Sequence, residues 1–250
     1  MLGLIAGQGA LPLEIARAAR RRGSEVFAVA LRGFASPALE AETARLHWFA
    51  AGEVAEALRA LQQSGAREVV LAGKVPKAAL FSQAGAAALA LDARAAAELA
   101  ALPDRRDSSI LARVVRALEA AGLRVLPQAE LIPELVAQPG ALGRIAPTAA
   151  QQRDIDVGVP IARALARHDV GQTLVIKHGA VLAIEAIEGT DAAIRRAGHF
   201  AAEATVIKVA RPQQDPRFDL PAIGPDTLDA LIAAGARCLA VEAGRTLLLE

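Results

Sequence analysis

Residues 1–31 read MLGLIAGQGALPLEIARAARRRGSEVFAVAL, and this stretch decides the fold. The apolar run at 2–6 is typical of a buried strand, and the glycines and proline at 7–12 mark a turn. Residues 13–22 have the apolar spacing of an amphipathic helix, and residues 25–31 form a second apolar run. A strand, a helix and a strand in this order pair in parallel through a right-handed crossover. We therefore predict an α/β fold that begins with a parallel sheet.

The same alternation continues through the first half of the chain. It predicts strands over 45–50, 68–72 and 123–126, and helices over 54–63, 86–102 and 108–121. We interpret residues 1–132 as a Rossmann-like nucleotide-binding domain with a parallel sheet. Prolines and glycines then gather between positions 133 and 147, which predicts a linker over 133–147.

Residues 148–250 follow a different pattern, typical of an α+β domain that we expect to be catalytic. A helix over 149–167 precedes strands over 172–177 and 181–186, and the short turn between the strands predicts an antiparallel hairpin. Further strands over 204–209 and 238–242 flank a helix over 227–234. The predicted fold class is therefore α/β, with an N-terminal Rossmann-like parallel-sheet domain and a C-terminal α+β domain.

The composition excludes several classes of protein. A hydrophobic fraction of 54% excludes a disordered chain. The net charge of +1 and an aromatic fraction of 3% argue against nucleic-acid binding. Cys238 is the only cysteine, which excludes an internal disulfide and fits a reducing cytosol. Since no uncharged apolar run reaches the roughly 18 residues that span a bilayer, we expect a cytoplasmic protein that touches a membrane at most at its surface.

The turn Gly7-Gln8-Gly9-Ala10-Leu11-Pro12 is the first candidate for ligand binding. Glycines let the backbone approach a nucleotide or phosphate at the next helix N-terminus. The alternative is a tight turn with Pro12 in the first helical turn. The dinucleotide fingerprint is incomplete here, because Pro12 replaces its third glycine and no acid follows the second strand. This argues against a nicotinamide oxidoreductase. Lys74 follows the strand over 68–72, at the edge where open parallel sheets bind ligands.

A second candidate is EAIEGTD at 185–191, where three carboxylates lie close together in the sequence. Clustered carboxylates repel one another unless a proton or cation lies among them, and Mg²⁺ prefers such oxygen ligands when phosphate is bound. The alternative is structural, since Thr190 and Asp191 are suited to the start of a helix. That alternative leaves Glu185 and Glu188 without a role.

A third candidate is KVARPQQDPRFDLP at 208–221, an irregular loop with two acids, two arginines and a lysine. Arginine binds phosphate through two donors, and lysine adds a point charge. The alternative is a solvated loop whose ion pairs stabilise little. The histidines have no metal-ligand spacing, and neither a G-x-S-x-G elbow nor a P-loop occurs. The remaining carboxylates and cations suit metal-assisted attack on a phosphoanhydride.

These segments together resemble the UDP-2,3-diacylglucosamine pyrophosphatases of the LpxI type, almost from end to end. The matching motifs are GLIAGQGALP at 3–12, LRGF at 31–34, AGKV at 72–75, DVGQ at 169–172, EAIEGTD at 185–191, RR at 195–196, KVARPQQ at 208–214, DLP at 219–221 and IG at 223–224. The later motifs are long and specific, whereas the N-terminal glycine turn alone is not.

The resemblance implies Mg²⁺-dependent hydrolysis of UDP-2,3-diacylglucosamine to UMP and 2,3-diacylglucosamine 1-phosphate (lipid X) in lipid A biosynthesis. It implies a lipid-linked nucleotide-sugar substrate, peripheral contact with the cytoplasmic side of the inner membrane, and a homodimer as a possible state. Asp219 is the expected catalytic residue, Asp191 is its rival, and both are expected to bind the metal with Glu188. The expected substrate-binding residues are Gly7, Gly9, Leu11, Lys74, Gln172, Thr190, Lys208, Gln214 and Arg217. A non-catalytic nucleotide-sugar or lipid-binding protein of the same fold is the alternative.

Overall fold

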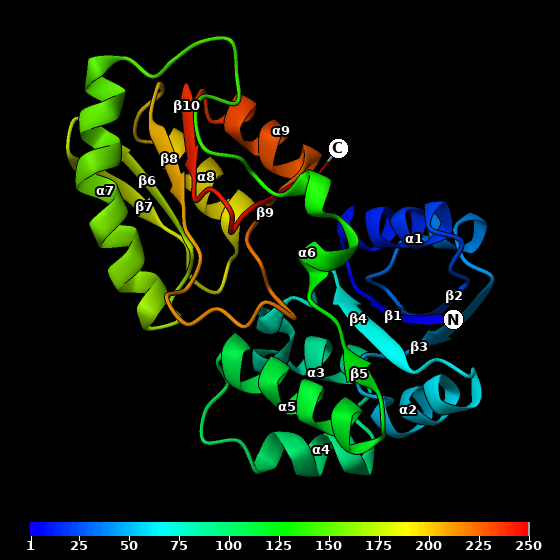
Figure 1. Cartoon of the computed structure of the whole chain (residues 1–250). Coiled ribbons are helices and arrows are strands. Elements are labelled where there is room, and N and C mark those ends of the chain that lie inside the picture. The colour runs from blue at the N-terminus through cyan, green and yellow to red at the C-terminus, as the bar shows by residue number, and fades with distance from the viewer. Residues whose placement is uncertain (250) are drawn as a thin grey trace. The chain divides into compact units, whose positions relative to one another are not determined.

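The computed structural model describes residues 1–249, apart from the side chains at positions 77 and 86. The chain forms two compact units, which Figure 1 shows in colours that follow the sequence. Unit 1 contains Met1–Pro133 and a short later segment, Pro216–Asp219; unit 2 contains Glu134–Asp215 and the chain from Leu220 onward. The chain therefore returns to unit 1 once, within the loop that the sequence marks as rich in charge.

Unit 1 is built on a five-stranded parallel sheet of order β3-β2-β1-β4-β5. Leu2 pairs with Val26 on one side and with Glu68 on the other, so β1 is central. The chain changes direction across the sheet between β1 and β4, and such a switch point is where Rossmann-type sheets bind ligands. The prediction of an N-terminal parallel sheet is confirmed. The strands are β1 Leu2–Ala6, β2 Val26–Leu31, β3 Arg45–Phe49, β4 Glu68–Ala72 and β5 Arg124–Val125.

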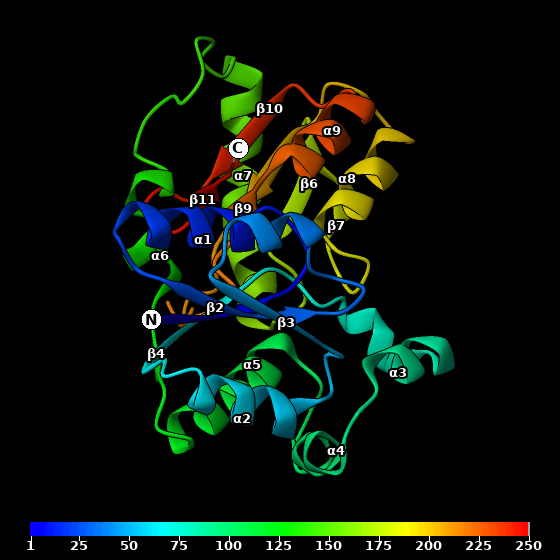
Figure 2. The same ribbon diagram turned by 90° about the vertical axis from the view of Figure 1, so that its right-hand side faces the viewer.

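Helices cover both faces of this sheet, as Figure 2 shows. Helix α1 (Leu11–Arg21) lies on one face, with Ile15, Ala16 and Ala19 fully buried. Helices α2 (Val54–Gln63) and α5 (Asp107–Ala120) lie on the other face and bury their apolar sides against the strands. The shorter elements are η1 Pro37–Ala41, η2 Lys77–Phe81, α3 Gln83–Leu89, α4 Ala93–Ala100, α6 Gln128–Leu131 and η3 Pro133–Leu135.

The single helix predicted over 86–102 is wrong, because two helices occupy this region. Helix α3 ends at Leu89, and Ala90 then adopts a left-handed conformation with φ of 49°. Asp92 caps α4 by accepting the N–H of Ala95 at 2.7 Å, and its other oxygen accepts the N–H of Ala55 at 2.8 Å. The aspartate therefore starts α4 and ties it to the first turn of α2. Aspartate is a favoured N-cap residue, so the signal was present in the sequence.

Unit 2 contains a four-stranded mixed sheet of order β10-β8-β6-β7. Strands β8 and β10 are parallel, whereas β6 is antiparallel to β7 and β8, so the predicted hairpin is confirmed. Asp154 holds the hairpin turn by accepting the N–H groups of His178 and Gly179. The strands are β6 Thr173–Lys177, β7 Ala180–Ile184, β8 Thr205–Lys208 and β10 Cys238–Val241, with a separate pair formed by β9 Ala222–Ile223 and β11 Leu247–Leu248.

Three helices sandwich the sheet of unit 2, again visible in Figure 1. Helix α7 (Ala149–Arg167) packs on one face, and α8 (Thr190–Gly198) and α9 (Pro225–Ala233) pack on the other. The side chains of β6 and β8 alternate between the two cores, with Leu174 and Ile207 facing α7. Within residues 1–249, no helix is long and apolar enough to cross a membrane.

Candidate functional site

The switch point of unit 1 brings two loops together at the carboxyl ends of β1 and β4. The main chains of Gln8 and Lys74 exchange N–H···O hydrogen bonds of 2.8 and 3.0 Å. A Cβ atom at Gly7 would lie 2.6 Å from the Lys74 carbonyl oxygen, and one at Gly73 would lie 2.6 Å from the Gly7 carbonyl carbon. These two glycines therefore allow the two loops to contact each other closely, and the space beside them is filled by protein main chain and not by a ligand. This close contact fixes the backbone that carries the exposed Lys74.

The rest of the glycine turn is open. Gly9 has φ of 103°, and a Cβ there would meet no atom within 4 Å. Helix α1 starts at Leu11 without a side-chain cap, and Pro12 lies in its first turn, as the tight-turn interpretation expects. Leu11 is only 7% exposed, so its side chain belongs to the core and only its main chain is available to a ligand. An uncapped helix start next to a lysine suits an anionic group.

A buried polar cluster lies at one end of the unit 2 sheet. Lys208, the last residue of β8, donates from Nζ to the Thr190 hydroxyl at 2.7 Å. That hydroxyl donates to Glu185 Oε1 at 2.8 Å, and the N–H of Gln172 donates to Glu185 Oε2 at 3.2 Å. Lys208 and Thr190 are 4% and 3% exposed. Thr190 does not cap α8, since the N-cap is Gly189, so its hydroxyl is committed to this cluster.

The charge state of Glu185 follows from these neighbours. Burial acts to raise the pKa of its carboxyl, because a carboxylate loses hydration in the interior. The charge of Lys208, together with the hydrogen bonds from Thr190 and from the Gln172 N–H, outweighs burial and lowers the pKa below its ordinary value. Glu185 is therefore a partly buried carboxylate, and Lys208 is its counter-charge.

The other two carboxylates of this segment have different partners. Glu188 accepts from Arg196 at 2.6 Å in a half-exposed ion pair. Asp191, in the first turn of α8, accepts from the Thr227 hydroxyl at 2.8 Å. Protein cations thus compensate Glu185 and Glu188, so their proximity in the sequence does not by itself require a metal. Among residues 1–249, no three His, Cys, Asp or Glu side chains converge on a point that could hold a metal ion.

The loop after β8 is fixed by a buried ion pair. Nε of Arg211 donates to Asp169 Oδ1 at 2.5 Å, with the two side chains 11% and 6% exposed. Arg245 donates to the Arg211 carbonyl oxygen, and the side-chain oxygen of Gln214 accepts the Arg211 N–H at 3.4 Å. Gln214 therefore supports the turn of this loop. The sequence identified the loop as a candidate but gave no sign of its partner, Asp169.

The end of the same loop belongs to unit 1. Phe218 is 4% exposed and packs in the core formed by α2, α5 and the sheet. Its neighbour Arg217 pairs with Glu119 on α5 at 2.6 Å. Asp219 follows with φ of 56°, a left-handed conformation that few residues other than glycine adopt and that aspartate tolerates better than most. Phe218 and Arg217 thus anchor Asp219 in a fixed, uncommon backbone conformation.

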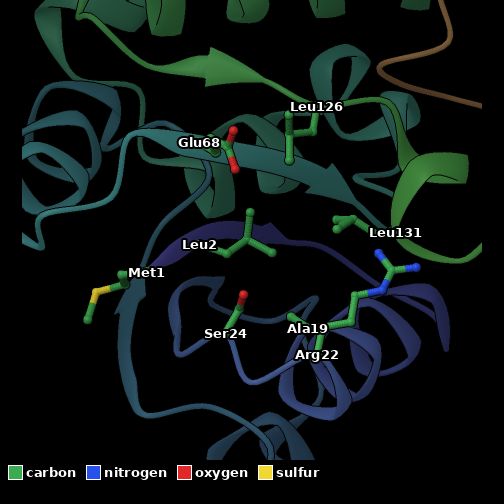
Figure 3. A pocket seen from close by; sticks show the side chains of 8 residues that line it. All are labelled: Met1, Leu2, Ala19, Arg22, Ser24, Glu68, Leu126 and Leu131. Atoms are coloured by element: carbon green, nitrogen blue, oxygen red, sulfur yellow. The ribbon is translucent and has the colours of Figure 1, made fainter.

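Figure 3 shows a small cavity of about 100 Å³ in unit 1. It is lined by Leu2, Glu68 and Arg22, among others, at the amino ends of β1 and β4. Lys74 and the glycine turn lie at the opposite, carboxyl ends of these strands. Because parallel sheets bind ligands at carboxyl ends, this cavity is not the candidate site.

The predicted site residues thus fall into two groups. Unit 1 holds Gly7, Gly9, Leu11, Lys74, Arg217 and Asp219, and unit 2 holds Gln172, Glu188, Thr190, Asp191, Lys208 and Gln214. Within unit 2, the structure joins Lys208, Thr190 and Gln172 through Glu185, which was not among the predicted site residues.

Comparison with known proteins adds the family. The model of the LpxI N-terminal domain matches residues 1–135, and that of the LpxI C-terminal domain matches residues 138–250. This chain belongs to the LpxI family. A protein of Caulobacter vibrioides (strain ATCC 19089 / CIP 103742 / CB 15), named UDP-2,3-diacylglucosamine pyrophosphatase LpxI, is 34% identical over 261 residues, which cover 100% of this chain and 90% of that protein.

Among solved structures, the biotin carboxylase subunit of pyruvate carboxylase matches at 12% identity and a TM-score of 0.29. The match covers 75% of this chain and 38% of that one. A likeness this weak carries no argument about the LpxI-family chain, whose assignment rests on the family match.

Proposed function

We propose that this LpxI-family chain hydrolyses the diphosphate of UDP-2,3-diacylglucosamine and releases UMP and 2,3-diacylglucosamine 1-phosphate (lipid X) in lipid A biosynthesis. The observation that carries the proposal is the 34% identity with a protein named for this activity, over the full length of the chain. The models of both LpxI domains match as well, over residues 1–135 and 138–250. The chain is accordingly a hydrolase that acts on a diphosphate bond.

Each unit carries a lysine that we propose as a phosphate-binding group. Lys208 is supported by a buried hydrogen-bond cluster, and the backbone of Lys74 is fixed by its pairing with Gln8. The N-terminus of α1 and the open Gly9 would bind the nucleotide half. Gln172, Thr190, Gln214 and Arg217 complete the proposed binding set, with Gln172 and Gln214 contributing through the segments that they hold in place.

Asp219 is the proposed catalytic residue and would position the attacking water. Its support is structural, because Phe218 anchors the preceding residue in a core and the backbone of Asp219 adopts a left-handed conformation. Uncommon backbone conformations of this kind gather at active sites. Asp191 stays the rival, and its carboxylate is oriented by Thr227.

The implied cofactor is Mg²⁺, and the residues fit one mode of binding it. Mg²⁺ usually takes one or two carboxylates together with substrate phosphates and waters, so the absence of a three-carboxylate cage among the described residues does not disagree with it. Asp219, or its rival Asp191, would hold the ion, with Glu188 as a further candidate despite its pairing with Arg196. When bound, Mg²⁺ would withdraw charge from the phosphate oxygens.

We also propose that the protein acts in the cytoplasm, at the surface of the inner membrane. Residues 74–91 contain two lysines and no acidic residue. Val75, Phe81 and Leu91 in this segment are 38%, 63% and 40% exposed. An apolar, cationic segment directly after Lys74 suits contact with an anionic lipid surface that presents the substrate.

The proposed homodimer would be tested by sedimentation of the purified chain.

The proposal is tested by release of UMP from UDP-2,3-diacylglucosamine by the purified protein, with Mg²⁺ and then with excess EDTA. We expect UMP release with Mg²⁺ and its loss with EDTA. Substrate that stays intact under both conditions would contradict hydrolysis. Binding of the substrate without UMP release would favour a non-catalytic nucleotide-sugar or lipid-binding protein instead.

A further inference from the structure

We propose that Glu185 is a positioning residue, which acts through Thr190 to orient and hold the charge of Lys208 for the substrate diphosphate. The inference rests on the proposed function, since it names the support of a group that would bind the diphosphate. The hydrogen bonds run from Lys208 Nζ to Thr190 Oγ1 at 2.7 Å, and from Thr190 Oγ1 to Glu185 Oε1 at 2.8 Å.

The three residues come from three different elements, which makes the arrangement sensitive to each. Glu185 follows β7, Thr190 is the first residue of α8, and Lys208 ends β8. The other carboxylate oxygen of Glu185 accepts the N–H of Gln172, just before β6. One carboxylate therefore links the ends of three strands to the start of a helix.

The direction of the hydrogen bonds explains why the carboxylate matters to Lys208. A hydroxyl has a single proton, and here Thr190 gives it to Glu185, so that an oxygen lone pair faces the ammonium. Without the negative charge of Glu185, the hydroxyl would no longer be held in this orientation. Lys208 would also lose a counter-charge that helps to keep a buried ammonium favourable.

Stability alone does not account for this cluster. A buried charged pair costs hydration, and apolar residues of similar size often stabilise a fold as well or better. The surrounding cores of unit 2 are apolar, with Val175, Ile194 and Val206 next to this end of the sheet. A buried lysine and hydroxyl joined in series to a partly buried carboxylate are therefore better explained by a charge that has to be held in one place. Asp191, the rival catalytic residue, directly follows Thr190.

Four single variants of the full-length protein, and the double variant Thr190→Val/Glu185→Gln, separate this role from a structural one. Thr190→Val removes the hydroxyl and keeps the shape, whereas Thr190→Ser keeps the hydroxyl. Glu185→Gln removes the charge and keeps an acceptor. Thr246→Val is the matched control, because Thr246 is also fully buried in unit 2 and its hydroxyl has no hydrogen-bond partner among the described residues. Thermal unfolding of each variant identifies those that remain folded.

The measurements are steady-state UMP release and, independently of turnover, calorimetric titration with UDP. We expect Thr190→Val and Glu185→Gln each to lower kcat/KM by roughly 10- to 100-fold, the equivalent of one hydrogen bond to a charged group. UDP affinity should fall as well. Thr190→Ser, which keeps the hydroxyl, should retain most of the wild-type kcat/KM and UDP affinity that Thr190→Val loses. Thr246→Val should behave as wild type. The double variant should lose little more than either single one, since both break the same series of bonds.

Three results would overturn the inference. The first is additive loss in the double variant, and the second is no recovery in Thr190→Ser. The third is UDP binding by folded Thr190→Val and Glu185→Gln that equals the wild type. If wild-type protein binds UDP but releases no UMP, the proposed hydrolysis fails while the UDP titrations still decide the role of Glu185. If it binds no UDP, the inference fails too.

Discussion

Arg211 and Asp169 form an ion pair of 2.5 Å with side chains only 11% and 6% exposed, which connects the loop after β8 to the turn between α7 and β6. Removing one partner deprives the other, buried charge of this counter-charge. We therefore expect Asp169→Asn to destabilise unit 2 by about 3 kcal/mol. The measurement is the midpoint of urea unfolding followed by circular dichroism.

The control for this pair is Arg163→Met, also in unit 2. Arg163 pairs with Glu242 at 2.9 Å, but its side chain is 55% exposed. Exposed pairs contribute about 0–1 kcal/mol, so the midpoint should hardly move. Equal shifts of the unfolding midpoint in the two variants would show that the buried ion pair of Arg211 stabilises unit 2 no more than an exposed ion pair does.

Gly7→Ala tests the contact between the two loops of unit 1. The added Cβ would lie 2.6 Å from the Lys74 carbonyl oxygen. Because this oxygen belongs to the main chain, the clash can be relieved only if the backbone itself moves. We expect the loop that carries Lys74 to shift and the apparent KM for substrate to rise roughly tenfold, the size of one lost charge-assisted contact. Gly143→Ala is the control, because a Cβ there meets no atom within 4 Å. Unchanged KM in folded Gly7→Ala would contradict a role for this loop in binding.

The fold could be predicted from the sequence where local patterns and pairing agree. Short apolar runs between helices of about ten residues indicate parallel strands, and the short turn at 178–180 indicates a hairpin; both were confirmed. The break between α3 and α4 was missed because alanine-rich sequence favours helix on both sides of Asp92. The return of Pro216–Asp219 to unit 1 depends on the tertiary packing of Phe218, which periodicity does not report.

The sequence predicted which types of residue the candidate site contains, but not which side chains bond to one another. Three carboxylates at 185–191 suggested a shared cation, yet Glu185, Glu188 and Asp191 bond to Lys208 through Thr190, to Arg196 and to Thr227, respectively. Spacing along the chain cannot show that β8 places a lysine beside the start of α8. The role of Glu185 therefore needed the strand register, in which Lys208 lies opposite Thr173.

Asp219→Asn and Asp191→Asn distinguish the two rival catalytic residues. Asparagine is the suitable replacement at 219, because it tolerates the left-handed backbone and removes only the charge. We expect Asp219→Asn to lower kcat by roughly 10³-fold with little change in substrate binding, as for a group that acts in the transition state. Asp191→Asn should lower it less. Near-normal kcat in Asp219→Asn, measured by UMP release, would transfer the catalytic role to Asp191.

Phe81→Ser tests the proposed membrane surface at residues 74–91. Phe81 is 63% exposed in a segment with two lysines and no acid, so wild-type protein should sediment with phosphatidylglycerol vesicles and much less with phosphatidylcholine vesicles. Insertion of a phenylalanine ring contributes about 1.5–3 kcal/mol. Phe81→Ser should therefore weaken binding to the anionic vesicles by roughly tenfold or more.

Phe200→Ser is the matched control, because Phe200 is 69% exposed but lies in unit 2, after α8. If binding depended only on general surface hydrophobicity, both variants would bind vesicles equally weakly. That result would contradict the assignment of the membrane surface to residues 74–91. An apolar and cationic contact requires that Phe81→Ser weaken vesicle binding and Phe200→Ser leave it unchanged. It also requires that high salt weaken vesicle binding by the wild-type protein. Release of UMP from substrate dispersed in detergent should then be similar in the two variants, because neither ring lies among the residues proposed to bind the diphosphate.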